Sequence, residues 1–218
     1  MKIVLINGSP KVKGSTSEAL TGALKDCLSS KADIIEIGFH APSLLPGAIE
    51  QMCDADAWVF LYPLYVDGIP GHLLSCLVQL EQAHLVNTDL RIYGIVNCGF
   101  YEGVQAEYAI DVLQNWCAKS RFTWGAGVGI GGGGASVQIT GSKPGQGPRA
   151  PIDHALEDLA QKILRRQADE KRYANIGFPR FLYKLGAQVS WRMLIKANGG
   201  KAKDLNKRLV DNPKGKIK

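Results

Sequence analysis

The turn at residues 7–17, "NGSPKVKGSTS", contains several side chains that could bind an anion. An apolar segment precedes the turn and a helical pattern follows it, so the turn leads into a helix N-terminus. Unpaired backbone N–H groups and the positive end of the helix dipole attract phosphate there. The sequence therefore predicts a phosphate-binding turn, and a helix start capped by Ser15 or Ser17 is the alternative. The groups that suit phosphate are two glycines, four hydroxyls and two cations: Gly8, Ser9, Lys11, Lys13, Gly14, Ser15, Thr16 and Ser17.

The spacing within this turn argues against two common nucleotide motifs. The Walker A motif has four residues between its glycines and a lysine after the second one. Here Gly8 and Gly14 enclose five residues, and Ser15 stands where the lysine should be. The dinucleotide motif GxGxxG also fails, because Pro10 replaces its second glycine. Nucleoside triphosphates and the usual dinucleotide cradle are therefore disfavoured.

Two further loops have chemistry that complements the turn. The segment "YPLYVDGIPGHL" at 62–73 is apolar and aromatic, which makes it a good wall for a flat ring. The segment "NCGFYEG" at 97–103 offers backbone amides together with Asn97, Phe100 and Tyr101. Either loop alone would be explained by ordinary packing between a strand and a helix. Together with the turn, they indicate one ligand site.

The elements that must position these loops alternate along the chain. Continuously apolar strands are typical of parallel sheets that are covered on both faces. Five such strands alternating with helices predict a right-handed, doubly wound α/β domain. Ligands bind to such sheets at the carboxyl ends of the strands, where all three loops fall. The expected strands are 3–6, 33–37, 57–62, 91–97 and 122–130, and the expected helices are 18–29, 69–80, 104–117 and 152–167. A Gly-rich stretch, 125–147, is expected to be a strand end followed by a mobile loop.

The quoted segments resemble the flavodoxin-like NAD(P)H-dependent FMN reductases and flavodoxin-family oxidoreductases over residues 1–170. The resemblance implies a flavodoxin-like five-stranded sheet with strand order 2-1-3-4-5 and one noncovalent FMN. By this likeness the flavin phosphate would be held by Ser9, Lys11, Ser15 and Thr16. The isoalloxazine would be lined by Pro63, Leu64, Tyr65 and Val66, and its far edge by Asn97, Cys98, Gly99 and Phe100. Iron–sulfur relatives carry a cysteine cluster before the third strand, where this chain has only Cys53, so no cluster is expected.

The expected activity is the passage of reducing equivalents from NAD(P)H through FMN to a small acceptor such as a quinone, a flavin or a nitro compound. Because the flavin performs this chemistry, no catalytic residue and no metal site are expected. The four histidines are scattered. His72, beside the apolar residues of the 62–73 loop, is the one to test. Two alternatives remain: a flavodoxin-type electron carrier that serves a protein partner, and a flavin-free scaffold. The family likeness favours a homodimer or a larger oligomer.

The composition is that of a soluble protein, with 45% apolar and 21% charged residues. We expect no transmembrane segment and no signal peptide, because no apolar run is long enough and the chain enters a strand at once. The five cysteines are scattered and form no CxxC pair, which suggests reduced thiols. These features together predict a cytoplasmic protein.

The charge divides the chain near residue 170. Residues 1–170 carry 13 basic and 18 acidic side chains, a net charge of −5, and residues 171–218 carry 13 and 2, a net charge of +11. We therefore expect a domain at 1–170 and a basic helical extension at 171–218. Within the extension, 179–196 predicts a helix with an apolar stripe. It could pack on protein or lie on an anionic membrane. Nucleic acid is not expected, because no binding motif is found. The stripe is Phe178, Leu182, Leu185, Val189 and Met193.

Overall fold

The computed structural model describes residues 1–85, 89–132 and 145–206. Most of the expected loop within 125–147 lies outside these described residues. The chain divides into two compact units, Met1–Gly177 and Phe178–Lys218. The division falls seven residues after the expected boundary at 170, because Arg172–Ala174 forms a strand of the first unit.

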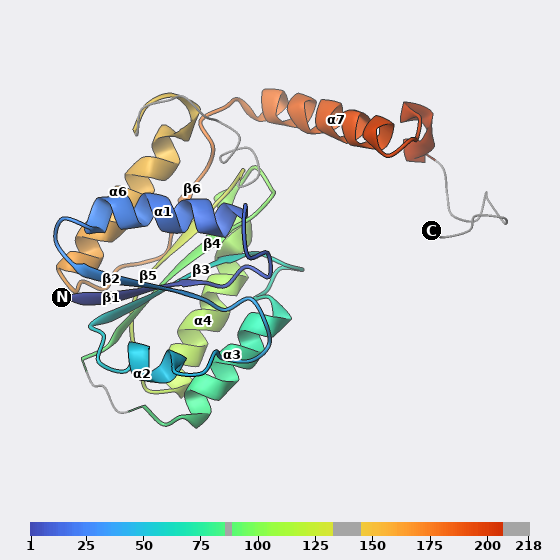
Figure 1. The fold of residues 1–218 in the computed structure, drawn as a ribbon. Coiled ribbons are helices and arrows are strands. Elements are labelled where there is room, and N and C mark those ends of the chain that lie inside the picture. The colour runs from blue at the N-terminus through green and yellow to red at the C-terminus, as the bar shows by residue number, and fades with distance from the viewer. Residues whose placement is uncertain (86–88, 133–144, 207–218) are drawn as a thin grey trace. The chain divides into compact units, whose positions relative to one another are not determined.

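The first unit contains a six-stranded parallel sheet in the order β2-β1-β3-β4-β5-β6 (Figure 1). The expected order 2-1-3-4-5 and the flavodoxin-like α/β class are confirmed, but the expected count of five strands is wrong. The sixth strand escapes detection because it has three residues, and Arg172 and Tyr173 are exposed. The strands are β1 Lys2–Asn7, β2 Asp33–Gly38, β3 Ala57–Pro63, β4 Arg91–Asn97, β5 Thr123–Ile130 and β6 Arg172–Ala174.

Helices cover both faces of this sheet (Figure 1). One core cluster joins α1 and α6 to one face, and the other joins α2, α3 and α4 to the opposite face. The five-residue α2 was not predicted, because one helical turn leaves no periodic apolar signal. The helices are α1 Thr16–Leu28, α2 Ala48–Met52, α3 Gly71–Gln82, α4 Glu107–Lys119 and α6 Ala150–Leu164, with 3₁₀ turns at Gly103–Ala106 and Gly147–Arg149.

The central strands are apolar throughout because each of their two faces meets a helix layer. In β3, Ala57, Val59 and Leu61 face the α1/α6 layer, while the residues between them face the other layer. An aromatic cluster fills that second layer, with ring centroids 5.3–6.4 Å apart. This packing fixes the sheet that carries the ligand-edge loops. The cluster is Trp58, Phe60, Trp116 and Phe122.

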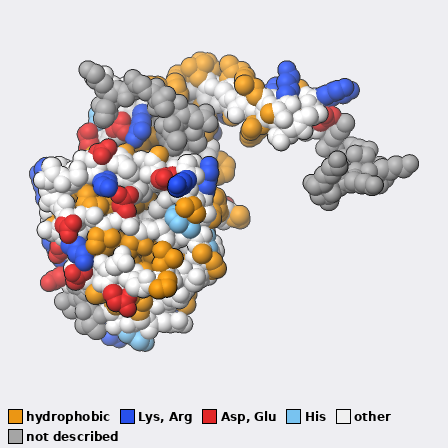
Figure 2. Space-filling model, viewed as in Figure 1, with side chains coloured by type: hydrophobic (Ala, Val, Ile, Leu, Met, Phe, Trp, Pro, Cys, Tyr) orange, Lys and Arg blue, Asp and Glu red, His pale blue; other side chains and the backbone are white. Residues whose placement is uncertain are grey.

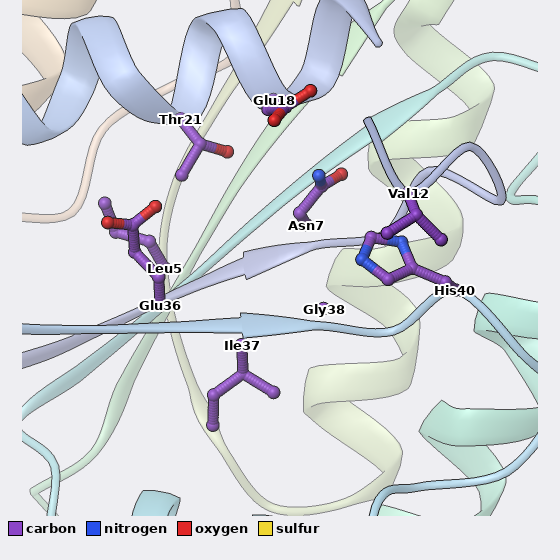
Figure 3. Close-up of a pocket in the computed structure, with 9 residues that line it drawn as sticks. All are labelled: Leu5, Asn7, Val12, Glu18, Thr21, Glu36, Ile37, Gly38 and His40. Atoms are coloured by element: carbon purple, nitrogen blue, oxygen red, sulfur yellow. The ribbon is translucent and has the colours of Figure 1, made fainter. Parts of the chain in front are cut away.

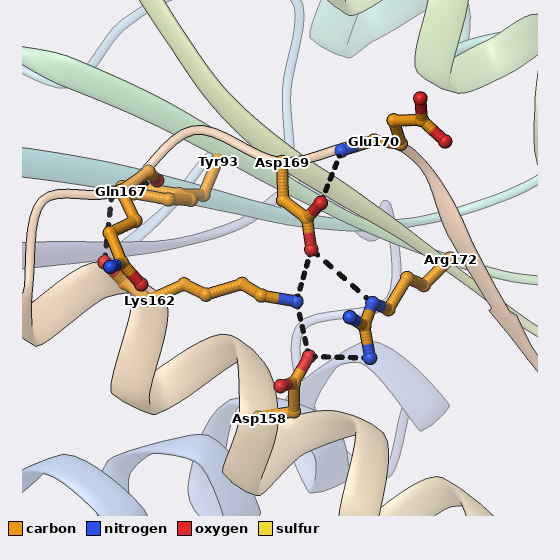
Figure 4. Close-up of polar contacts among 7 residues, drawn as sticks. All are labelled: Tyr93, Asp158, Lys162, Gln167, Asp169, Glu170 and Arg172. Carbon is orange, nitrogen blue, oxygen red and sulfur yellow. Dashed lines mark hydrogen bonds and ion pairs between the residues drawn. The ribbon is translucent and has the colours of Figure 1, made fainter.

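Four charged side chains connect α6 with the segment that leads into β6 (Figure 4). Lys162 bonds to Asp158 and lies 2.5 Å from Asp169. Arg172 reaches the same two carboxylates at 3.2 and 3.3 Å. The hydrogen bond from Lys162 and a second one from the Glu170 N–H lower the pKa of Asp169. This network therefore holds β6 at the edge of the sheet.

The lowered pKa predicts how Asp169 affects acid stability. A carboxyl group whose pKa is depressed by folding stabilises the protein above its ordinary pKa of about 3.9, and this stabilisation is lost as the pH falls through the folded-state value. Asp169→Asn should therefore flatten the dependence of the unfolding free energy on pH below about pH 5. Urea unfolding at a series of pH values measures this slope. Asp26→Asn on the exposed surface of α1 is the control, and equal slopes for wild type and Asp169→Asn would refute the prediction.

The second unit contains the helix α7, Arg180–Ala197, and a 3₁₀ turn at Ala202–Asn206. The expected helix at 179–196 is thus shifted by one residue. Within the described part of the chain, α7 buries none of its residues, and hydrophobic side chains lie along it (Figure 2). Phe181, Leu185 and Met193 are each at least 60% exposed. None of the helices among the described residues has the length and apolar character needed to span a membrane.

Candidate functional site

The three loops singled out by the sequence follow strands that are neighbours in the sheet. The order β1-β3-β4 brings their carboxyl ends to one edge. Backbone hydrogen bonds extend the pairing into the loops, from Gly8 N to Leu61 O at 2.8 Å and from Leu64 N to Asn97 O at 2.8 Å. The structure therefore brings the predicted phosphate turn together with the loops at 62–73 and 97–103, which we call the two ring loops.

The turn enters α1 through a capping box. The Ser15 hydroxyl accepts a hydrogen bond from Glu18 N at 3.0 Å, and the Glu18 carboxylate accepts one from Ser15 N at 3.4 Å. The same carboxylate accepts a bond from Gly14 N, and Gly14 has the positive φ of +69° that glycine adopts without strain. Ser15 is therefore the helix cap that the sequence offered as an alternative, and it still lies within the predicted phosphate turn.

The other predicted phosphate groups lie around the same turn. Ser9 is buried, and its hydroxyl accepts a hydrogen bond from Lys11 N at 3.2 Å. The Lys11 ammonium donates to Gly14 O at 2.9 Å, so its charge lies over the turn. Thr16 is the first residue of α1. Hydroxyls, a cation and a helix N-terminus fit a phosphate group, whereas the carboxylate of Glu18 opposes it.

Glu18 was not singled out from the sequence. Of the charged groups at the turn, its carboxylate should oppose phosphate binding most strongly. Its carboxylate occupies two turn amides, Gly14 N and Ser15 N, as an internal anion. Glu18→Gln should keep the capping box, since glutamine also serves at this position, and remove the charge. We expect FMN to bind about two- to five-fold more tightly, which corresponds to about 0.4–1 kcal/mol for an exposed charge.

Flavin fluorescence titration measures the affinities of wild type and Glu18→Gln. The matched control is Glu50→Gln, which removes an exposed acid in the first turn of α2. If Glu18→Gln bound FMN more weakly than this control, Glu18 would not compete with the phosphate for the turn amides but would support phosphate binding.

The first ring loop carries a tight turn at its tip. Tyr65 and Gly68 exchange two backbone hydrogen bonds of 3.1 Å, and Val66 and Asp67 between them have φ of 49° and 56°. A β-branched residue in this region is strained by about 1–2 kcal/mol. Val66 is fully exposed and Tyr65 about half exposed, whereas Leu64 packs against the core. Strain and exposed apolar area at the ligand edge are typical of functional loops.

The loop after β4 turns its first two side chains inward. The Asn97 amide donates to Ser17 Oγ at 2.8 Å and to Tyr62 O at 3.1 Å, which joins the ends of three elements. Cys98 is buried, and burial raises the pKa of its thiol, so the thiol stays protonated at neutral pH. Gly99 is exposed, with no atom near its Cβ position, and Phe100 is 56% exposed. Of the four residues predicted here, Gly99 and Phe100 are therefore exposed to solvent, whereas Asn97 and Cys98 are buried.

A small pocket lies on the β2 side of β1, between α1 and β2, whereas the ring loops lie on the β3 side (Figure 3). Its volume is about 170 Å³. Its two carboxylates already have partners, because Glu36 pairs with Lys25 and Glu18 with the turn. The pocket is separate from the predicted ring loops, which follow β3 and β4. Its lining is Leu5, Asn7, Val12, Glu18, Thr21, Glu36, Ile37, Gly38 and His40.

Comparison with solved structures establishes the fold. An azoreductase from Bacillus anthracis superposes with a TM-score of 0.52 and 18% identity, over 76% of this chain and 99% of that one. An NADH:FMN oxidoreductase in its apo form gives 0.56 and 15%, over 82% and 96%. A short-chain flavodoxin associated with a bacterial microcompartment gives 0.54 and 16%, over 77% and 99%. No protein-family model and no curated protein sequence matches this chain. The first unit therefore has a flavodoxin-like fold.

Proposed function

We propose that this protein is an FMN-dependent oxidoreductase that passes reducing equivalents from NAD(P)H to a small acceptor, namely a quinone, a flavin or a nitro compound. One observation carries the proposal: a phosphate-type turn and two partly apolar loops meet at the carboxyl edge of a flavodoxin-like sheet. The similar structures support it, because one is named as an azoreductase and another as an NADH:FMN oxidoreductase.

Each loop has a defined task in this proposal. Ser9, Lys11, Ser15 and Thr16 hold the phosphate, and Lys11 adds the charge that a dianion needs. Pro63, Leu64, Tyr65 and Val66 line the ring, where the exposed Tyr65 and Val66 exclude water from one side. Backbone groups of Asn97–Phe100 border the far edge. When bound, FMN supplies the transfer of hydride and electrons, so the chain needs to bind, orient and shield it.

A spectrum and a rapid-mixing experiment test the proposal. Purified protein should carry or take up FMN, and NADH or NADPH should bleach the bound flavin within the time of one turnover. A protein that binds FMN but is reduced only through a separate reductase would instead be an electron carrier, the alternative that the similar flavodoxin favours. A colourless protein that ignores FMN would overturn both.

The proposal extends to the cell compartment and to the second unit. The five cysteines all lie in the described part of the chain and form no disulfide there, which supports a cytoplasmic location. Residues 178–218 carry 11 basic and 2 acidic side chains, a net charge of +9, against an acidic first unit. We assign this unit to docking on protein within a homodimer or larger oligomer.

Truncation after Gly177 tests the role of the second unit. We expect the shortened protein to keep its FMN site and to lose its oligomeric state in analytical ultracentrifugation, because all residues of both core clusters lie before 175. If truncation left sedimentation unchanged but abolished binding to anionic vesicles, we would assign the second unit to a membrane contact and not to a protein contact.

A further inference from the structure

Two histidines hold consecutive carbonyl groups of the phosphate turn. His40 Nδ1 lies 2.6 Å from Ser9 O, and His72 Nε2 lies 3.1 Å from Gly8 O. His40 follows β2, and His72 is the second residue of α3, which follows β3. Since β2 and β3 flank β1 in the sheet, the two imidazoles reach the turn from opposite sides.

The acceptors define which ring nitrogen of each histidine is the donor. A carbonyl oxygen can only accept, so His40 must carry its proton on Nδ1 and His72 on Nε2. Both side chains are half-buried, which strengthens these bonds relative to exposed ones. The ring of His40 lies over the backbone of Gly38, where a Cβ atom would come within 2.1 Å of its Nε2. This glycine is therefore required to seat the His40 ring.

The two bonds fix the direction of two carbonyl groups. The Ser9 carbonyl belongs to a peptide group without an N–H, because Pro10 follows it, and the Gly8 carbonyl shares its peptide group with the Ser9 N–H. The carbonyl oxygens of Gly8 and Ser9 carry negative charge and would repel a phosphate if they turned toward it. The imidazole donors hold both oxygens, and the Ser9 N–H is fixed on Asn7 Oδ1 at 3.1 Å. Gly8 packs closely against α3, since a Cβ atom there would lie 2.6 Å from Leu73 Cδ2. The stem of the turn is thus fixed before a ligand arrives.

We infer that His40 and His72 are positioning residues that set the turn for the phosphate of FMN and thereby select phosphorylated flavin over riboflavin. This inference rests on the proposed function. Neither imidazole has to touch the ligand, since each acts through a backbone carbonyl. Their contribution should therefore appear in FMN affinity and be missing from riboflavin affinity, because riboflavin has the same ring without the phosphate.

Amide side chains that imitate one ring nitrogen test the inference. Asparagine can place its N–H₂ near the position of Nδ1, and glutamine near that of Nε2. His40→Ala and His72→Ala should each weaken FMN binding about ten-fold, the value of one buried hydrogen bond, and leave riboflavin binding within about two-fold. His40→Asn and His72→Gln should restore most of the loss, whereas the exchanged pair, His40→Gln and His72→Asn, should not.

Fluorescence titration with FMN and with riboflavin measures these affinities, and thermal unfolding verifies that each variant is folded. His154→Ala, an exposed histidine on α6, is the control. An equal loss of affinity for FMN and riboflavin would overturn the inference and leave the proposed function standing. Equal FMN affinities of the matched and exchanged amide variants would do the same. Wild-type protein that binds neither flavin would overturn the proposed function and this inference with it.

Discussion

Ser15→Asp should weaken FMN binding about 10- to 100-fold while leaving α1 folded. The new carboxylate would lie in the turn that is proposed to hold the phosphate, and a lost charge-assisted contact costs about 1.5–3 kcal/mol. Aspartate is as good a helix cap as serine, so it can accept the bond that Ser15 Oγ now receives from Glu18 N. The substitution therefore separates the two roles of this residue. Calorimetric titration with FMN measures the loss.

Ser15→Asn is the matched control for this charge. Asparagine has nearly the shape of aspartate and caps helices as well, but it is neutral. We expect it to bind FMN at least five-fold more tightly than Ser15→Asp, and both variants to unfold within about 1 kcal/mol of wild type. An FMN affinity of Ser15→Asp equal to that of wild type would show that the phosphate is not bound at this turn.

Gly131→Ala should lower the unfolding free energy by about 3 kcal/mol, the upper end of the usual cost of overpacking. Gly131 follows β5, and a Cβ atom there would lie 2.1 Å from Tyr101 O and 2.6 Å from Gly103 N. Backbone atoms cannot rotate away as a side chain can, so the loop after β4 would have to shift. FMN affinity should fall with stability, because that loop includes Gly99 and Phe100.

Gly22→Ala is the opposing control for Gly131→Ala. Gly22 lies in the middle of α1, and apart from its chain neighbours and the backbone of α1 no described atom lies within 4 Å of its Cβ position. Alanine should therefore stabilise the protein by about 0.5–1 kcal/mol through its higher helix propensity. Chemical denaturation of both variants gives the two free energies. A loss below about 1 kcal/mol for Gly131→Ala would mean that the loop yields easily and is less firmly packed than its contacts indicate.

Much of the fold could be predicted from local apolar patterns. The strand at 91–97 is observed at Arg91–Asn97, and the other four predicted strands agree to within one residue at each end. These segments are predictable because a strand covered on both faces must be apolar along its length. β6 and α2 were missed for the opposite reason: with three and five residues, they are held by neighbours and not by a pattern of their own.

The location of the candidate site was also predictable, but the direction of its side chains was not. Asn97 was expected beside the flavin, yet its amide bonds to Ser17, 80 positions away along the chain. His40 reaches Ser9 across 31 positions, and nothing in the sequence near either residue indicates this. Such partners are chosen by the sheet order, which places β2 and β3 beside β1.

The alternation of strands and helices, and therefore the edge at which the three loops meet, could be predicted from the sequence alone. Periodicity and turn chemistry are local properties, so a single chain is enough to show them. Three features became visible only in the folded chain: Glu18 occupies the turn amides, Asn97 and Cys98 face inward, and two histidines bond to the turn. Hydrogen bonds depend on distances of about 3 Å between atoms, and only the packed sheet sets those distances.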